Sequence, residues 1–194
     1  DRLAGMGART VFIDYPQSSG EHDLGEEALK AALKRNSTRT IVVRRSSVKS
    51  GLNRSEPEEV SFKLPEGVRE AVSAWNVNFI GYAVDTRRAM TVDKVWVPSV
   101  ASTQDRGESQ GDLIFPEFSL RLDSIPIVDA RSVLQGRMPA DAFSGKLVFV
   151  TMTNPQLDSA LGYYGHGAQK VPAALVDYSG IRGSARGDAN VLGW

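Results

Sequence analysis

Three apolar segments of the chain end in, or are followed by, polar side chains that could bind a ligand. Asp14 stands at the end of the first segment, and Arg44 and Arg45 stand at the end of the second. A carboxylate can hold a metal ion or a polar ligand group, and an arginine pair can clamp an anion through its planar forks. With the polar residues of the third segment, the candidate ligand-binding residues are Asp14, Arg44, Thr151, Thr153, Asn154 and Asp158.

Each candidate also has a simple structural interpretation. Asp14 could bond the local backbone in a turn, and the two arginines could form a solvated pair. Pro155 could make the stretch after the third segment a plain structural turn. The residue types alone leave both interpretations open.

The common catalytic motifs are missing from the sequence. A nucleophile elbow needs Gly-x-Ser-x-Gly, which does not occur. Ser144-Gly145-Lys146 precedes an apolar segment, whereas a phosphate loop must follow a strand. The glycine-rich stretch from Gly162 to Gly167 lacks the dinucleotide-binding spacing. We therefore expect no catalytic residues and no cofactor, so that the chain would not be an enzyme.

Cysteine and histidine, two of the metal-ligating residue types, are absent or scarce in the sequence. The chain has no cysteine and two histidines, His22 and His166, which excludes disulfides, thiolate metal sites and a multi-histidine zinc site. A carboxylate site made of Asp14, Asp158 and His166 stays open as an alternative and would indicate a metal-dependent hydrolase or transferase. His166 is more simply interpreted as a solvated histidine in a loop, and we expect no metal.

A βαβ unit at the N-terminus would position the first two groups. The apolar runs 10–15 and 40–44 predict buried strands, and a helix from Asp23 to about Arg35 lies between them. Asp23 and Glu26 have capping-box spacing, and Glu26 and Lys30 are spaced for an ion pair. The expected apolar face consists of Leu24, Ala28, Ala31 and Ala32. This order favours parallel strands, whose carboxyl ends share one edge of the sheet.

The remaining elements are predicted from their periodicity. Residues 146–152 give the clearest strand pattern, and 78–84 and 93–97 predict antiparallel neighbours. Helices are expected from Pro65 through the stripe Val68, Ala71, Val72 and Trp75, and over 129–135 and 170–178. We expect Trp75 and Trp96 to be core residues. A turn is expected over 139–143, and loops are expected over 46–61 and 101–112. The stretch 113–122 is predicted to be either a strand or a helix that begins at Pro116.

Composition sets broad limits. The 194 residues fit one α/β domain over 1–194, with a mixed, partly parallel central sheet flanked by helices and a weakly specified tail at 180–194. Lys plus Arg and Asp plus Glu both number 23, so no basic excess indicates nucleic-acid binding. The sequence contains no run of about 18 apolar residues, the length that is needed to span a bilayer. The chain starts at Asp1 without methionine, and we expect it to be part of a longer protein.

Three groups of segments resemble the type-two CHASE domain, an extracellular sensory module associated with cyclases and histidine kinases. The first is Gly7–Asp14, followed by the helix expected from Asp23. The second is Ile80–Tyr82 with Asp93–Trp96 and Pro116–Leu120. The third and most specific is Val133–Gly136 with Phe143–Val150, after which Asp158 matches an aspartate of the family.

This resemblance implies a sensor on the extracytoplasmic, periplasmic face of the bacterial inner membrane. Flanking membrane helices outside this chain would connect it to a cytoplasmic cyclase or kinase. The partner would be an unknown small ligand or a periplasmic protein. A homodimer is compatible with the sequence, and binding of nucleic acid is not expected. A scaffold or protein-interaction domain without a small ligand is the other alternative.

Overall fold

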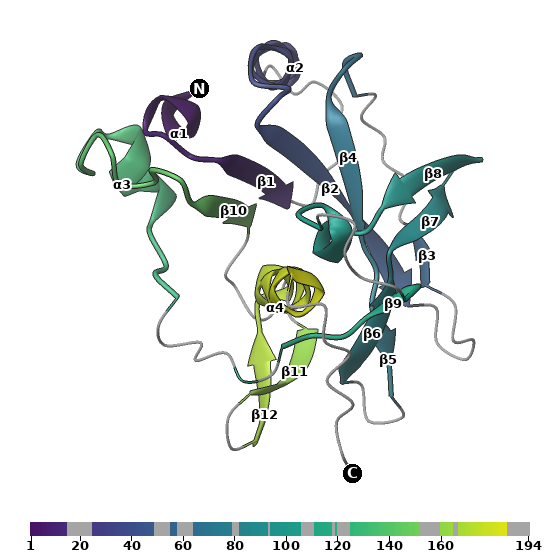
Figure 1. Cartoon of the computed structure of the whole chain (residues 1–194). Coiled ribbons are helices and arrows are strands. Elements are labelled where there is room, and N and C mark those ends of the chain that lie inside the picture. Colours follow the sequence, from purple (N-terminus) through teal and green to yellow (C-terminus); the bar gives the residue numbers. More distant parts are fainter. Residues whose placement is uncertain are drawn as a thin grey trace. The chain divides into compact units, whose positions relative to one another are not determined.

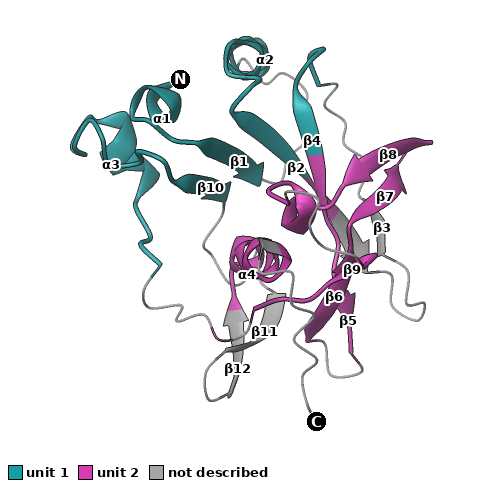
Figure 2. Ribbon diagram, viewed as in Figure 1, with its two compact units in different colours: residues 1–43, 59–70, 125–151 teal, residues 44–58, 71–124, 152–194 magenta. Residues whose placement is uncertain are grey.

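The computed structural model describes residues 1–14, 25–48, 55–57, 64–78, 82–92, 94–105, 111–117, 119, 125–151, 160–164 and 167–185. The chain divides into two compact units (Figure 2). The first comprises Asp1–Val43, Glu59–Glu70 and Ile125–Thr151, and the second comprises Arg44–Glu58, Ala71–Ser124 and Met152–Trp194. The expectation of a single domain over 1–194 stays a prediction.

The first unit is built on parallel strands (Figure 1). β1 (Thr10–Asp14) lies between β10 (Leu147–Thr151) and β2 (Thr40–Val48) and runs parallel to both. Its residues pair with β10 from Thr10↔Leu147 to Asp14↔Thr151. Phe12 and Phe149 are register partners, and their rings stack with centroids 4.5 Å apart. The predicted α/β fold with an N-terminal βαβ unit is confirmed.

Two further strands make this sheet mixed. The last part of β2 pairs antiparallel with β3 (Ser55–Pro57), and β4 (Arg69–Ser73) also pairs with β2. The expected loop over 46–61 is therefore wrong in part, because β2 continues to Val48 and β3 lies inside that range. Serine and glutamate do not by themselves prevent pairing at a sheet edge, where one side of a strand faces water.

The connection between β1 and β2 contains the helix α2 (Glu26–Arg35). The predicted Glu26–Lys30 ion pair is confirmed at 2.5 Å, and Glu27 lies 3.0 Å from the same ammonium. The predicted apolar face is wrong, since Ala28 and Ala31 are exposed and Leu33 is the buried residue. Burying a leucine removes more apolar area from water than burying an alanine methyl, so the larger side chain determines the face. Asp23 and Leu24 lie outside the described residues.

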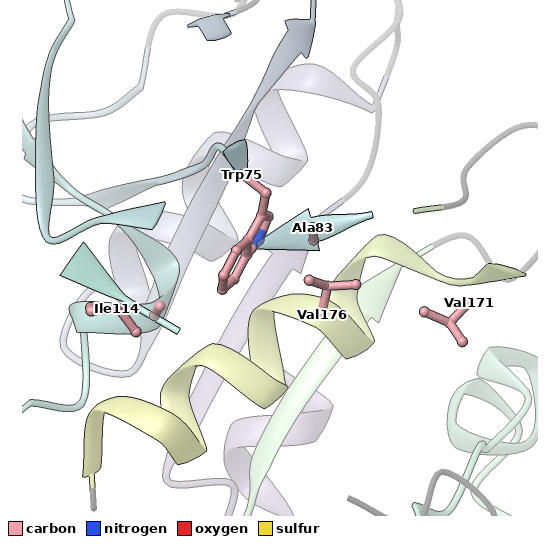
Figure 3. Packing of buried hydrophobic residues seen from close by; sticks show 6 residues of the cluster. Trp75, Ala83, Ile114, Val171 and Val176 are labelled. Carbon is pink, nitrogen blue, oxygen red and sulfur yellow. The ribbon is translucent and has the colours of Figure 1, made fainter. Parts of the chain in front are cut away.

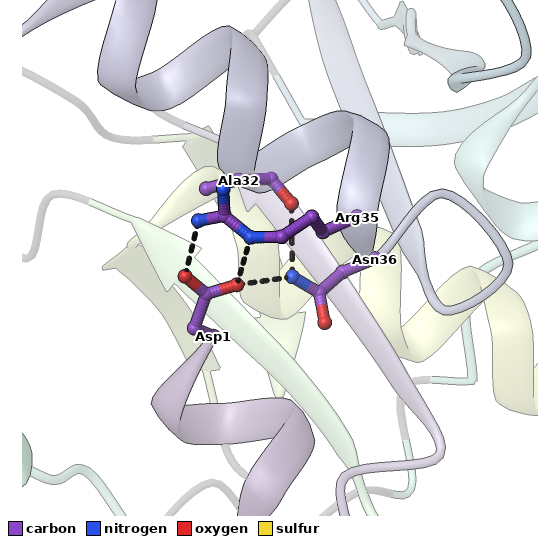
Figure 4. A network of polar contacts seen from close by, with 4 residues as sticks. All are labelled: Asp1, Ala32, Arg35 and Asn36. Carbon is purple, nitrogen blue, oxygen red and sulfur yellow. Dashed lines mark hydrogen bonds and ion pairs between the residues drawn. The ribbon is translucent and has the colours of Figure 1, made fainter.

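Polar contacts fix the end of α2 to the start of the chain (Figure 4). The Arg35 guanidinium donates to Asp1 Oδ2 at 2.6 Å, and Asn36 Nδ2 donates to Asp1 Oδ1 at 2.6 Å and to the Ala32 carbonyl at 2.8 Å. The Ala32 carbonyl also accepts from the Asn36 backbone N–H at 3.1 Å, so Asn36 bonds it twice at the end of the helix.

Two short helices complete the first unit. α1 (Arg2–Gly5) contacts α3 (Ala130–Leu134), and Arg2 Nη1 donates to the Val133 carbonyl at 3.2 Å. Asp129 caps α3 by accepting from the Arg131 N–H at 3.2 Å. The helix expected over 129–135 and the turn over 139–143 are confirmed, and the strand expected over 146–152 is confirmed in its described part as β10.

In its described residues, the second unit contains three small antiparallel sheets and one long helix, besides β3 and the ends of β2 and β4. β5 (Asn76–Val77), β6 (Ala83–Arg87) and β9 (Leu113–Ile114) form one sheet, β7 (Ala89–Val92) and β8 (Val95–Pro98) a second, and β11 (Ala160–Tyr164) and β12 (Gly167–Val171) a third. The 3₁₀ helix η1 (Val100–Ser102) packs against α4 (Ala173–Ala185).

A buried cluster lies against α4 (Figure 3). The Trp75 ring lies between Ile114 and Val176, and Ala83, Ala101 and Val171 complete the cluster. A second cluster joins Val72 and Ala74 to Val92 and Val97 of the β7–β8 hairpin.

The helix predicted from Pro65 is wrong, because this segment forms β4 and β5. Its residues from Ala71 to Trp75 are all buried, so three of the four residues of the predicted stripe belong to a continuous buried run, and Val68 is half-buried. Gly67 has φ +81° and the Val68 N–H donates to the Pro65 carbonyl at 3.2 Å. This left-handed residue closes a turn and stops a helix from forming.

Several boundaries and pairings also differ from expectation. Val95–Pro98 pairs with β7 and not with the strand expected at 78–84. The strand observed near that range is β6, which begins later than expected and covers 83–87. Lys94, at φ +67°, supplies the left-handed conformation that a tight hairpin needs. The helix expected at 170–178 is α4 over 173–185, so the expected tail begins inside a helix. The described residues of the glycine-rich stretch 162–167 belong to strands, since residues 162–164 end β11 (Ala160–Tyr164) and Gly167 begins β12 (Gly167–Val171).

Candidate functional site

The carboxyl edge of the parallel sheet brings two of the predicted binding residues together. Asp14 and Thr151 are the last residues of β1 and β10 and are register partners. Thr151 Oγ1 donates a hydrogen bond to Asp14 Oδ2 at 3.3 Å, which is long for an O–H···O contact. The predicted convergence of Asp14 and Thr151 at this edge is therefore confirmed. We call this pair the rim.

Burial gives the two rim residues different roles. Asp14 has 0% of its surface exposed, whereas Thr151 is half-buried. In this arrangement Asp14 orients the Thr151 hydroxyl and acts as a positioning residue. A threonine hydroxyl can donate one hydrogen bond and accept others, so a ligand at the rim would meet a group of the kind that accepts from N–H or O–H.

The backbone explains why the two strands end in register. Gly7 has φ +81°, and a Cβ atom on it would lie 3.1 Å from Ser144 Cα. The Gly145 N–H donates to the Gly7 carbonyl at 3.0 Å, and the Arg9 N–H donates to the Lys146 carbonyl at 2.9 Å. This close approach aligns the starts of β1 and β10 and so determines that Asp14 meets Thr151 four residues later.

Of the other predicted residues, Arg44 alone lies within the described ranges. Arg44 is half-buried in β2 and, like Arg45, belongs to the second unit. Thr153, Asn154 and Asp158 lie outside the described residues, as do His22 and His166. Within the described ranges, no three histidine or acidic residues gather closely enough to hold a metal ion.

A buried polar cluster in the second unit was not predicted. Asp177 of α4 is 1% exposed, and its Oδ1 accepts hydrogen bonds from Ser73 Oγ at 3.0 Å and from Trp75 Nε1 at 2.9 Å. The signal in the sequence is an aspartate within the small and apolar segment Ala173–Gly180, because a charged group on a buried face needs hydrogen-bond partners.

The two tryptophans within the described ranges differ in exposure. Trp75 is 9% exposed and belongs to the core, as predicted. The prediction that Trp96 is a core residue is wrong, since it is 74% exposed on β8. It pairs with the exposed Thr91, while Met90 and Val97 lie on the opposite, packed face of the hairpin.

The chain matches no protein-family model, and comparisons with curated proteins and with solved structures also return no match. Over the described part of the chain, no helix has the length and apolar character needed to cross a membrane.

Proposed function

We propose that this chain is the extracytoplasmic sensor domain of a membrane-bound bacterial receptor. It binds a small ligand or a periplasmic partner at the rim formed by Asp14 and Thr151, and it signals to a cytoplasmic cyclase or kinase. It recognises the ligand without transforming it.

The observation that carries the proposal is that two of the segments resembling the type-two CHASE domain are neighbours in one sheet. Residues 7–14 contribute β1, and 143–150 contribute the preceding turn and nearly all of β10. Gly7, Ser144 and Gly145 meet at the backbone, which gives a physical reason for the small residues in both segments. The rim lies at the carboxyl ends of these strands, where open α/β sheets bind ligands.

Signalling would follow from differential binding. A ligand shifts a conformational equilibrium only by the difference between its affinities for the two states. A ligand donor held by the Thr151 hydroxyl would favour the arrangement in which Thr151 bonds to Asp14, and segments beyond this chain would transmit the difference.

A thermal-shift screen of donor-bearing metabolites tests the rim. We expect a binding metabolite to raise the melting temperature of the wild-type chain, since a ligand selective for the folded state stabilises it. The shift should be lost in Thr151→Val, which keeps the shape and removes the hydroxyl. Ser144→Ala, at the opposite end of the β1–β10 pair, is the matched control and should keep the shift.

Three results would contradict this proposal. A metabolite shift equal in wild type and Thr151→Val would remove the rim as the binding site. Turnover by the purified chain, or calorimetric binding of a divalent cation that Asp14→Ala abolishes, would favour the metal-dependent enzyme.

The extracytoplasmic location has its own test. In the full reading frame, a periplasmic topology reporter fused to this segment should be active.

A further inference from the structure

α4 is held in the second unit by contacts that reach its backbone. Within the described residues it packs on η1, β9 and β11. The Glu117 N–H donates to the Ser179 carbonyl at 3.1 Å, and Ser179 Oγ donates to the Glu117 carbonyl at 3.0 Å. The Glu117 carboxylate also forms an ion pair with Arg182 at 3.5 Å. The segment at 115–117 therefore runs directly along the helix.

Two glycines allow this approach. A Cβ atom at Gly183 would lie 2.1 Å from the Phe115 carbonyl oxygen. A Cβ atom at Gly180 would lie 2.6 Å from the Trp75 ring and 2.8 Å from the Ala101 methyl carbon. Neither glycine has a positive φ, so close packing is the reason for glycine at these positions.

The same residues make α4 a poor helix by itself. Glycine occupies two of its 13 positions. Five further positions hold valine, aspartate, serine or isoleucine, namely Val176, Asp177, Ser179, Ile181 and Ser184. These are weak helix formers, and isolated helices of about 12 to 15 residues are marginal in water even when rich in alanine. The helix therefore depends on the contacts that hold it.

We infer that α4 is an order–disorder element, which is helical only while Asp177 is bonded to Ser73 and Trp75 and while Gly180 and Gly183 are in contact with their neighbours. Undocking removes the buried partners of Asp177 and the packing at both glycines together, so docking and helix formation occur as one step. The inference concerns the folding of α4 alone and does not rest on the proposed function.

The Gly183→Ala variant gives a test in which the sign of the effect is decisive. Alanine is the better helix former, so it would protect α4 if helix propensity limited its stability. If docking limits it, the methyl group clashes with the Phe115 carbonyl and α4 opens more often. In native-state hydrogen exchange of the full chain, we expect the α4 amides to exchange together, about 10-fold to 100-fold faster than in wild type.

Matched variants separate local opening from general destabilisation. Gly5→Ala in α1 is the control, because no atom lies within 4 Å of its Cβ position, and it should leave α4 exchange unchanged. Asp177→Ala should accelerate the same α4 amides, and Ser73→Ala, which removes one hydrogen bond, should do so to a smaller extent and can be used if the other variants do not fold.

Three outcomes would overturn the inference. One is slower α4 exchange in Gly183→Ala. Another is acceleration confined to amides next to the substituted residue. The third is equal acceleration in α4 and in β1 of the first unit, which would mean that α4 opens only when the whole chain unfolds.

Discussion

The same residue type serves opposite roles at two positions of the second unit. The Trp75 indole is packed between Ile114 and Val176 and donates to Asp177. The Trp96 indole is largely exposed on β8. A large aromatic side chain can stabilise a core or leave its apolar surface open to water, and its neighbours in three dimensions decide which.

The two tryptophans should be distinguishable by fluorescence in a Trp194→Phe background. Trp96 should emit at long wavelength and be quenched by iodide, while Trp75 should emit at short wavelength and resist quenching. By urea unfolding, Trp75→Phe should cost about 1 to 3 kcal/mol, because it leaves the buried Asp177 carboxyl one hydrogen-bond donor short. Trp96→Phe should change stability by about 0.5 kcal/mol or less. Equal quenching of both residues would contradict this assignment.

At the residue scale, the proximity of Asp14 and Thr151 could be predicted from the sequence, because parallel strands place their last residues at one edge of the sheet. The hydrogen bonds of Asp177 could not be predicted, because its partners Ser73 and Trp75 are more than 100 positions away in the chain. No local pattern encodes that contact.

At the scale of elements, local chemistry was predictable where it acts within one helix or strand. The Glu26–Lys30 pair of α2 depends only on helical spacing and is present. The helix predicted from Pro65 is wrong because every residue from Ala71 to Trp75 is buried, and a continuous buried run also contains apolar residues at helical spacing, here Ala71, Val72 and Trp75. Tertiary burial on both sides of the segment therefore overrode the local pattern.

The α2 ion pairs predict a pH effect. The hydrogen bonds to Glu26 and then to Glu27 raise the pKa of Lys30 above its ordinary value. A pKa raised by folding contributes stability that is fully present below the unfolded pKa and is lost as the pH rises through the folded pKa. Because Lys30 lies at the surface, we expect a small effect, best observed by NMR titration of its side chain.

The control for this titration is the double variant Glu26→Gln and Glu27→Gln. Lys30 should then titrate at lower pH than in wild type, because both carboxylate partners are gone. An unchanged titration midpoint would mean that these ion pairs do not persist in solution.

At the scale of the whole molecule, each unit is assembled from three separate pieces of chain. The first unit needs residues 125–151 to supply β10 and α3. Composition and periodicity predicted the strands themselves. They could not predict the division into units, because this depends on contacts such as that between Gly7 and Ser144, which no local pattern reveals.

A truncated chain should show this dependence. We expect residues 1–124 to lack protected amides in β1, because every residue of β1 pairs with β10 in the full chain. Residues 1–185 serve as the control and should keep those amides protected, as measured by hydrogen exchange. Protection of β1 in the 1–124 fragment would show that β2 alone holds it.

The register between Asp14 and Thr151 also has a consequence for biosynthesis. The two residues are 137 positions apart, so β1 leaves the ribosome long before its outer neighbour has been translated. During that interval the apolar strand Thr-Val-Phe-Ile is exposed and prone to aggregation. Production of this protein in cells should therefore depend on chaperones that shield a nascent chain.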